Sequence, residues 1–129
     1  MKKIILAALM MGISATALAE WVRVGGNDKV TAYADPTTLR QKGNIMRVTS
    51  LFDFKEESLL IDGSPYMSVI RETEFNCKDH VQHMVGYSIY SASMGKGKQL
   101  EKGTDPQDWK QVTPSGIAHA MWNFACHRD

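Results

Sequence analysis

The sequence predicts an α+β domain in which one antiparallel meander sheet packs against a C-terminal helix and one disulfide closes the fold. Three observations lead to this fold class. Residues 45–54 and 66–77 alternate apolar and polar side chains with the period of a strand. Residues 113–126 instead repeat apolar side chains at helical spacing. Two cysteines, Cys77 and Cys126, end the second strand and the helix, where one bridge would join them.

The first nineteen residues precede this domain and have the three zones of an export signal. Lys2 and Lys3 are basic, residues 4–13 are apolar, and Ala17-Leu18-Ala19 offers small residues for cleavage. The apolar run is shorter than the ~20 residues of a bilayer-spanning helix. We therefore expect cleavage after Ala19, a single domain over residues 20–129 and no membrane span. The mature protein is expected in the periplasm, at the cell surface or outside the cell.

The expected mature chain is almost neutral. It contains thirteen Lys and Arg and fourteen Asp and Glu, a formal net charge of −1. Nucleic-acid binding depends on clustered positive charge, so the sequence predicts no nucleic-acid partner. The sequence also contains no phosphate-binding loop, dinucleotide fingerprint or nucleophile elbow. We therefore expect no enzyme activity and no cofactor.

The mature chain begins with a predicted hairpin. Residues 21–24 and 30–34 are rich in β-branched and aromatic side chains, and Gly25-Gly26-Asn27-Asp28 between them suits a tight turn. Asp35-Pro36 is expected to end the second strand, because proline lacks the amide hydrogen that a continuing strand uses. Gly43-Asn44 predicts the next turn.

Two long strands are predicted in the middle of the chain. One face of the first strand carries Met46, Val48, Phe52 and Phe54. Leu51 interrupts the second face, which is otherwise polar. A connection over residues 55–65 includes the turn Asp62-Gly63-Ser64-Pro65, and residues 66–77 then alternate again. Two long strands joined in this way indicate an antiparallel meander.

The last third of the chain contains one more strand and the helix. Residues 85–92 are a strand candidate, residues 94–98 form a turn or a bulged strand, and residues 101–111 are predicted to form a loop around Trp109. For the helix, Thr113 can cap the first turn and Pro114 suits its first position. Its apolar stripe contains Ile117, Ala120, Met121, Phe124 and Ala125.

The two cysteines allow one pairing within the chain, and an export compartment favours disulfides. A bridge that closes about fifty residues would stabilise the fold by roughly 4 kcal/mol. Two free thiols, or a bridge between two copies of the chain, remain the alternatives at this level.

Short motifs spread over nearly all of the mature chain carry a family resemblance. They are Trp21-Val22, Tyr33-Ala34-Asp35, Thr38-Leu39-Arg40, Leu51-Phe52-Asp53-Phe54, Tyr66-Met67-Ser68, Glu74-Phe75-Asn76-Cys77, Pro114-Ser115-Gly116-Ile117-Ala118, Met121-Trp122 and Ala125-Cys126. In these residues the chain resembles the surface-adhesin protein E family of Gram-negative bacteria. The resemblance implies a small antiparallel sheet flanked by helix, a bridge between the two cysteines, and attachment to host surface proteins.

The leading function hypothesis is a non-enzymatic binding module that contacts a protein partner. Trp109 is the best single candidate for an exposed contact. Lys96 and Lys98 are candidates for a basic tip that meets an acidic partner, with a solvated turn as the alternative. An exposed edge strand is a template for pairing with a second copy, so a homodimer is also predicted as possible.

The second hypothesis is a periplasmic metal or small-ligand carrier. His80 and His83 follow Cys77 at three-residue spacings, and His127 follows Cys126. A disulfide would bring His80 and His127 close together. Two or three imidazoles are common ligands of zinc and copper in proteins. Solvated polar residues are the alternative interpretation of the three histidines.

Glu72 and Glu74 are the one candidate pair of catalytic carboxylates. Their spacing places both carboxylates on one face of a strand. Such a pair serves as acid and base when its surroundings separate the two pKa values. The alternative is an exposed face that keeps the sheet hydrated, with Arg47 or Arg71 neutralising the two charges.

Overall fold

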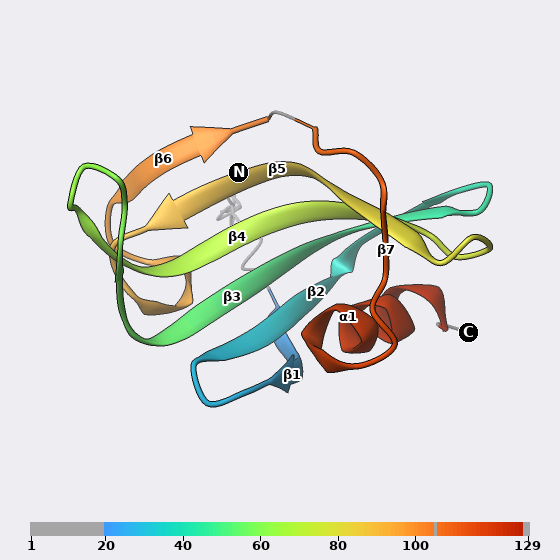
Figure 1. Ribbon diagram of the computed structural model, residues 1–129, viewed down its shortest axis with the longest axis horizontal. Coiled ribbons are helices and arrows are strands. Elements are labelled where there is room, and N and C mark those ends of the chain that lie inside the picture. The colour runs from blue at the N-terminus through green and yellow to red at the C-terminus, as the bar shows by residue number, and fades with distance from the viewer. Residues whose placement is uncertain (1–19, 105, 128–129) are drawn as a thin grey trace, which may run out of the picture.

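Consecutive strands lie side by side in one antiparallel sheet, and a C-terminal α-helix packs against one face of it (Figure 1). The computed structural model describes residues 20–104 and 106–127. The expected export signal, residues 1–19, lies outside the described residues. Within these residues the sheet has seven strands in the order β1 to β6, with β7 paired to β5. The predicted α+β meander is therefore confirmed.

The bounds of the elements are as follows. The strands are β1 (Val22–Gly26), β2 (Val30–Lys42), β3 (Ile45–Leu59), β4 (Pro65–Asn76), β5 (Val81–Tyr90), β6 (Gln99–Gly103) and β7 (Lys110–Gln111). A 3-10 turn, η1 (Ser93–Gly95), follows β5, and α1 (Gly116–Cys126) ends the fold. No helix in the described part of the chain has the length and apolarity that crossing a membrane requires.

Strand β2 continues through Asp35-Pro36, so the prediction that it ends there is wrong. The β2–β3 register shifts between Asp35 and Arg40, and Pro36 lies in this irregular stretch, where no ladder amide is needed. The buried carboxylate of Asp35 accepts hydrogen bonds from the amide and the hydroxyl of Thr37 at 3.0 and 2.6 Å. The Thr38 hydroxyl accepts the amide of Thr49 at 2.9 Å. Side chains thus replace the ladder bonds that the irregular stretch lacks.

Two connections are shorter than predicted. β3 extends to Leu59 and β4 begins at Pro65, so the expected connection over residues 55–65 is largely strand. The pairing resumes after a register shift, with Ser58 opposite Tyr66 and Leu59 opposite Pro65. The expected loop over residues 101–111 likewise contributes the ends of β6 and the whole of β7. Pairing between strands imposes extended structure on both segments, a contribution that the preferences of single residues do not contain.

Helix α1 begins at Gly116, two residues later than Thr113 and Pro114 predict. Ser115 at the N-cap is extended, with φ −152° and ψ 172°, and Gly116 has φ +84°, which favours glycine. The Thr113 hydroxyl donates to the Ser115 carbonyl at 2.9 Å instead of capping the helix. The positive φ of Gly116 therefore turns the chain at the first residue of the helix.

The main core lies between α1 and the sheet face beneath it. Its residues pack where the predicted apolar faces of the strands and the helix meet. The buried members of this core are Ala32, Ala34, Val48, Phe75, Met121, Trp122 and Ala125. The helical stripe predicted from the sequence is the surface that covers the strands.

The opposite face of the sheet is covered near its centre by the loop that contains η1. Leu51, the residue that interrupts the polar face of β3, is fully buried there. Asp53 accepts the amide of Met94 at 2.8 Å, and the Ser68 hydroxyl donates to the Ala92 carbonyl at 2.6 Å. Residues 94–98 are thus a turn, folded back onto the sheet. Leu51 is apolar because this loop covers it and shields it from water.

The predicted disulfide is confirmed. Cys77 and Cys126 are bridged, with their Cα atoms 5.5 Å apart, and both cysteines lie in the described part of the chain. The bridge ties the turn after β4 to the end of α1. The alternatives of two free thiols and of an intermolecular bridge are therefore excluded.

Candidate functional site

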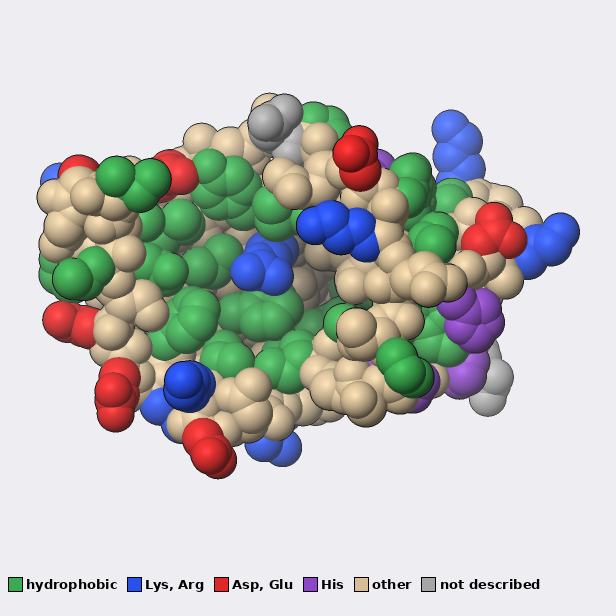
Figure 2. Space-filling view, in the orientation of Figure 1, with side chains coloured by type: hydrophobic (Ala, Val, Ile, Leu, Met, Phe, Trp, Pro, Cys, Tyr) green, Lys and Arg blue, Asp and Glu red, His purple; other side chains and the backbone are tan. Residues whose placement is uncertain are grey.

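Helix α1 covers only part of the sheet face on which it packs. Its main contacts are with β1 to β4, and it makes no comparable contact with β5 in the described part of the chain. Figure 2 shows that hydrophobic side chains gather over the part that α1 leaves open, that the surface is hollowed there, and that a basic side chain lies among them. A cavity of about 500 Å³ occupies the hollow. We call it the β4–β5 hollow; its central lining is Tyr66, Val69, Arg71, Met84, Tyr87 and Ile89.

Strand register explains why these side chains share one face. Val69 lies opposite Ile89, and Arg71 lies opposite Tyr87. Side chains of directly opposed residues project from the same face of a sheet. Val69 also lies opposite Phe52 of β3, which continues the apolar surface toward α1. The hollow is therefore formed by the regular alternation of β3, β4 and β5.

Arg71 is one of two basic residues that line the hollow, and the other is Lys110. Its guanidinium carbon lies 4.4 Å from the centroid of the Phe52 ring, a cation–π contact. Within residues 20–104 and 106–127 it makes no ion pair and no hydrogen bond to a side chain. Burial lowers the pKa of Arg71 below its ordinary value, and Tyr66 offsets part of this effect. A desolvated cation with no anionic partner thus lies in an apolar surface.

One edge of the hollow is formed by the segment that leads to β7. Gln107, Asp108 and Lys110 line this edge together with His83. The His83 ring stacks on Trp109 with centroids 3.8 Å apart, and its nitrogens lie 2.9 Å from the Gln107 carbonyl and 2.8 Å from Glu74. Trp109 keeps 43% of its surface exposed. The indole is therefore held in place by His83 and still accessible, although Trp109 itself does not line the hollow.

Lys96 and Lys98 lie elsewhere. Both are exposed and belong to the loop that covers the opposite face of the sheet. Neither lysine lines the β4–β5 hollow. Their interpretation as a basic tip for an acidic partner stays a prediction.

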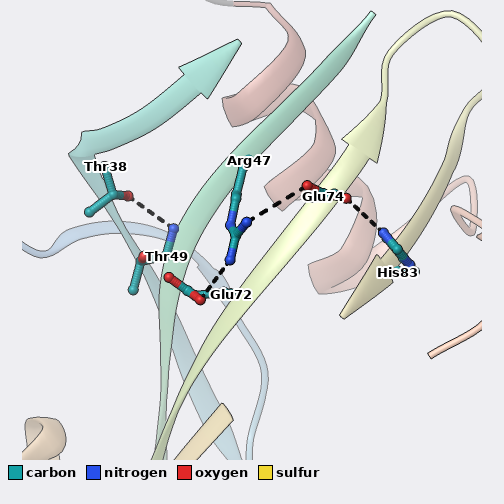
Figure 3. A network of polar contacts seen from close by, with 6 residues as sticks. All are labelled: Thr38, Arg47, Thr49, Glu72, Glu74 and His83. Atoms are coloured by element: carbon teal, nitrogen blue, oxygen red, sulfur yellow. Dashed lines mark hydrogen bonds and ion pairs between the residues drawn. The ribbon is translucent and has the colours of Figure 1, made fainter. Parts of the chain in front are cut away.

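Glu72 and Glu74 belong to a polar network on the face opposite α1 (Figure 3). Arg47 lies 3.0 Å from Glu72 and 3.9 Å from Glu74, and Glu74 also contacts His83. Arg47 is thus the neutralising residue, because Arg71 projects from the other face. Each carboxylate has a basic neighbour, which favours a role in holding β3, β4 and β5 together.

The histidines of the metal hypothesis divide between two tryptophans. His80 stacks on Trp122 at 4.3 Å, and His127 meets the same indole edge-on at 5.1 Å, whereas His83 stacks on Trp109. His119, which the hypothesis omitted, lies 6.4 Å from Trp122. The described residues contain no group of three His, Cys, Asp or Glu side chains that could hold a metal ion. The histidine arrangement therefore does not support the carrier hypothesis.

The sequence interpretation missed Arg71 as a site residue. The alternation of residues 66–77 already places Arg71 on the face of Val69 and Phe75, which otherwise carries no charged residue. A basic residue on an apolar strand face is the signal that could have identified it. What the pattern could not reveal is that α1 stops short of this part of the face.

Comparison with known proteins identifies similar sequences and folds. The family model described as "Surface-adhesin protein E" matches residues 21–127. Comparison with curated proteins finds no significant match.

Three solved structures of Haemophilus influenzae protein E share the fold. One structure of that protein has a TM-score of 0.64 at 15% identity, and the match covers 83% of each chain. Its crystal form II has a TM-score of 0.68 at 14% identity and covers 93% of this chain and 97% of that one. Protein E from a non-typeable strain has a TM-score of 0.63 at 16% identity and covers 96% of this chain and 83% of that one. At these identities the likeness establishes the fold alone.

Proposed function

The chain belongs to the surface-adhesin protein E family, and from this premise we propose that it is an exported, non-enzymatic binding protein that attaches to a host or envelope protein. The observation that carries this proposal is the open sheet face beside α1, with the β4–β5 hollow at its centre. Protein interfaces are anchored by aromatic residues and arginine, surrounded by apolar contacts that exclude water. The open face has this composition.

The proposed contact surface consists of the hollow and its edge. Val69 and Ile89 supply apolar area, and Tyr66 and Arg71 are residue types that often anchor interfaces. Trp109 adds an exposed aromatic ring at the edge, held by its stack on His83. A partner that covered this surface would bury apolar side chains that α1 leaves exposed to water. We place the partner here rather than on the opposite face, where charged pairs dominate.

Binding to a panel of purified host surface, matrix and envelope proteins tests this proposal. We expect at least one partner to bind the wild-type chain. Ile89→Asp should weaken that binding at least tenfold, and Trp109→Ala severalfold, because truncating an interface anchor costs about 1 kcal/mol or more. Biolayer interferometry measures these affinities.

Arg40→Ala is the matched control for the binding test. Arg40 is exposed and lies opposite Arg47 in the β2–β3 register, which places it on the other face. The control should bind like the wild type. Equal binding by Ile89→Asp would place the partner elsewhere, and a cross-linking survey with no captured host or envelope protein would remove the proposed function altogether.

Export with cleavage after Ala19 is part of this proposal. The amide nitrogen of Glu20 lies 3.3 Å from the carboxylate of Asp35, which is 4% exposed. Cleavage would convert that nitrogen into an ammonium group, and charge-assisted hydrogen bonds are roughly twice as strong as neutral ones. Removal of the signal would therefore stabilise the irregular stretch of β2.

A chain that retains Leu18-Ala19 before Glu20 is expected to be about 1 kcal/mol less stable than one that begins at Glu20, because a neutral amide replaces the ammonium. Urea unfolding measures the difference. In an Asp35→Asn background the two chains should be equally stable. Equal stability with Asp35 in place would contradict the pairing, and the mass of the exported chain reports the cleavage site directly.

The predicted homodimer through an edge strand stays a prediction. Strand β1 pairs only with the first part of β2. Within the described residues, Arg40 to Lys42 of β2 pair with β3 on one side, and their other side is an unpaired edge of the sheet. Charged side chains on such an edge commonly oppose strand pairing between copies.

A further inference from the structure

We propose that the β4–β5 hollow is a binding site for a small amphiphile that carries one carboxylate on an apolar body, with Arg71 as the residue that binds the carboxylate. This goes beyond attachment to a protein partner and does not depend on it. Four features of the hollow lead to this class of ligand: an unpaired arginine, an apolar lining, a matching volume and a balanced charge.

The unpaired arginine defines the polar end of the ligand. Burying a charge without an anionic partner is unfavourable, and within the described residues the guanidinium of Arg71 has the Phe52 ring beside it but no ion pair. The lowered pKa of Arg71 has the same cause, its removal from water. A guanidinium binds a carboxylate through two parallel hydrogen bonds in one plane. An incoming carboxylate would thus supply the partner that the described residues do not.

The apolar lining and the volume define the rest of the ligand. Val69, Met84 and Ile89 surround the arginine with aliphatic and thioether groups. Binding sites for small molecules are typically about 300–1,000 Å³ and mostly apolar, with few polar groups. At roughly 30 Å³ for each water-sized group, the cavity of about 500 Å³ accommodates on the order of fifteen non-hydrogen atoms. A twelve-carbon fatty acid has about that size.

The charges at the edge limit the ligand to one negative charge. Glu101 and Asp108 line the hollow as carboxylates, opposed by Arg71 and Lys110. The Tyr87 hydroxyl donates to Glu101 at 2.7 Å and so holds that carboxylate at the edge. A phosphate dianion or a polyanion would meet these two carboxylates, whereas a single carboxylate on Arg71 would not require further cations.

Binding of dodecanoate tests the proposal by isothermal titration calorimetry, with dodecanol and dodecyltrimethylammonium as ligands of equal chain length. We expect the wild-type protein to bind dodecanoate at least tenfold more tightly than either comparison ligand. Arg71→Met keeps the apolar length and removes the charge, so it should reduce this preference to within about twofold. Arg40→Met, the same substitution on the opposite face, should keep the preference.

A second measurement on the wild-type protein keeps the proposal testable even if Arg71→Met fails to fold. In NMR spectra, dodecanoate should shift the side-chain Nε–H resonance of Arg71 and the methyl groups of Val69 and Ile89, and dodecanol should leave the arginine resonance in place. Equal affinity for dodecanoate and dodecanol overturns the proposal. Shifts confined to the exposed Leu59 and Ile61 also overturn it, because they would report adsorption to the β3–β4 turn. Loss of protein-partner binding alone affects only the proposed attachment function.

Discussion

Replacing Cys77 and Cys126 by serine lowers the free energy of unfolding by about 4 kcal/mol. The bridge closes a loop with a sequence separation of 49, and the entropy that such a loop loses in the unfolded chain is worth roughly this amount at 25 °C. The bridge also holds the C-terminal end of α1 to the turn after β4. Helix α1 forms the main core together with the sheet. A domain of this size has a free energy of unfolding of about 5–15 kcal/mol, so loss of the bridge would remove a large fraction of that stability.

Urea unfolding of the double variant Cys77→Ser/Cys126→Ser measures this effect. The wild-type protein in the presence of a reducing agent serves as its control, because it removes the bridge without changing a side chain. Both should lose a similar amount of stability. A difference from the oxidised wild type below about 1 kcal/mol would show that α1 is held by its packing alone and that the bridge contributes little.

Phe75→Ala is expected to lower the free energy of unfolding by about 3–5 kcal/mol, the usual result of emptying the site of a buried phenylalanine. Phe75 is 1% exposed and packs in the main core with Trp122 and Met121 of α1. Its neighbour in the register is Met46 of β3, so the cavity would open between the sheet and the helix. Thermal and urea unfolding of the purified variant measure the loss.

Phe54→Ala is the matched control for this prediction. Phe54 lies on the same face in β3 but is only partly buried, and it packs edge-on against Tyr66 at 5.7 Å. We expect a clearly smaller loss of stability there, and a change within about 0.5 kcal/mol for Leu59→Ala, whose side chain is 67% exposed. Equal losses at Phe75 and Phe54 would mean that the core extends over the whole face and would argue against an open binding surface.

Much of the architecture could be predicted from the pattern of apolar and polar residues along short segments of the sequence. The alternation over residues 45–54 and 66–77 corresponds to the paired strands β3 and β4, and the helical stripe that contains Met121 and Ala125 is the face of α1 that covers the core. Two cysteines in an exported chain predicted the bridge that the structure contains. These features depend on residues close together in sequence, or on a pairing that admits one solution, and a pattern can show them.

The errors and omissions have a common cause in long-range contacts. Asp35-Pro36 ends no strand, because a buried carboxylate and the Thr38 hydroxyl satisfy backbone groups around it. Leu51 interrupts a polar face because the loop of η1 folds back over it. His83 joins Glu74 and Trp109 instead of His80 and His127, since the register of β4 and β5 decides its neighbours.

By itself, the sequence determined the α+β meander, the C-terminal helix and the bridged cysteines, because periodicity and cysteine content indicate these directly. Its short motifs carried the resemblance to the surface-adhesin protein E family. Only the tertiary structure decided that α1 leaves part of the sheet uncovered and that Arg71 lies unpaired in the resulting hollow. The physical reason is that a residue's face is set by its own strand, whereas the cover over that face is set by where a distant helix packs.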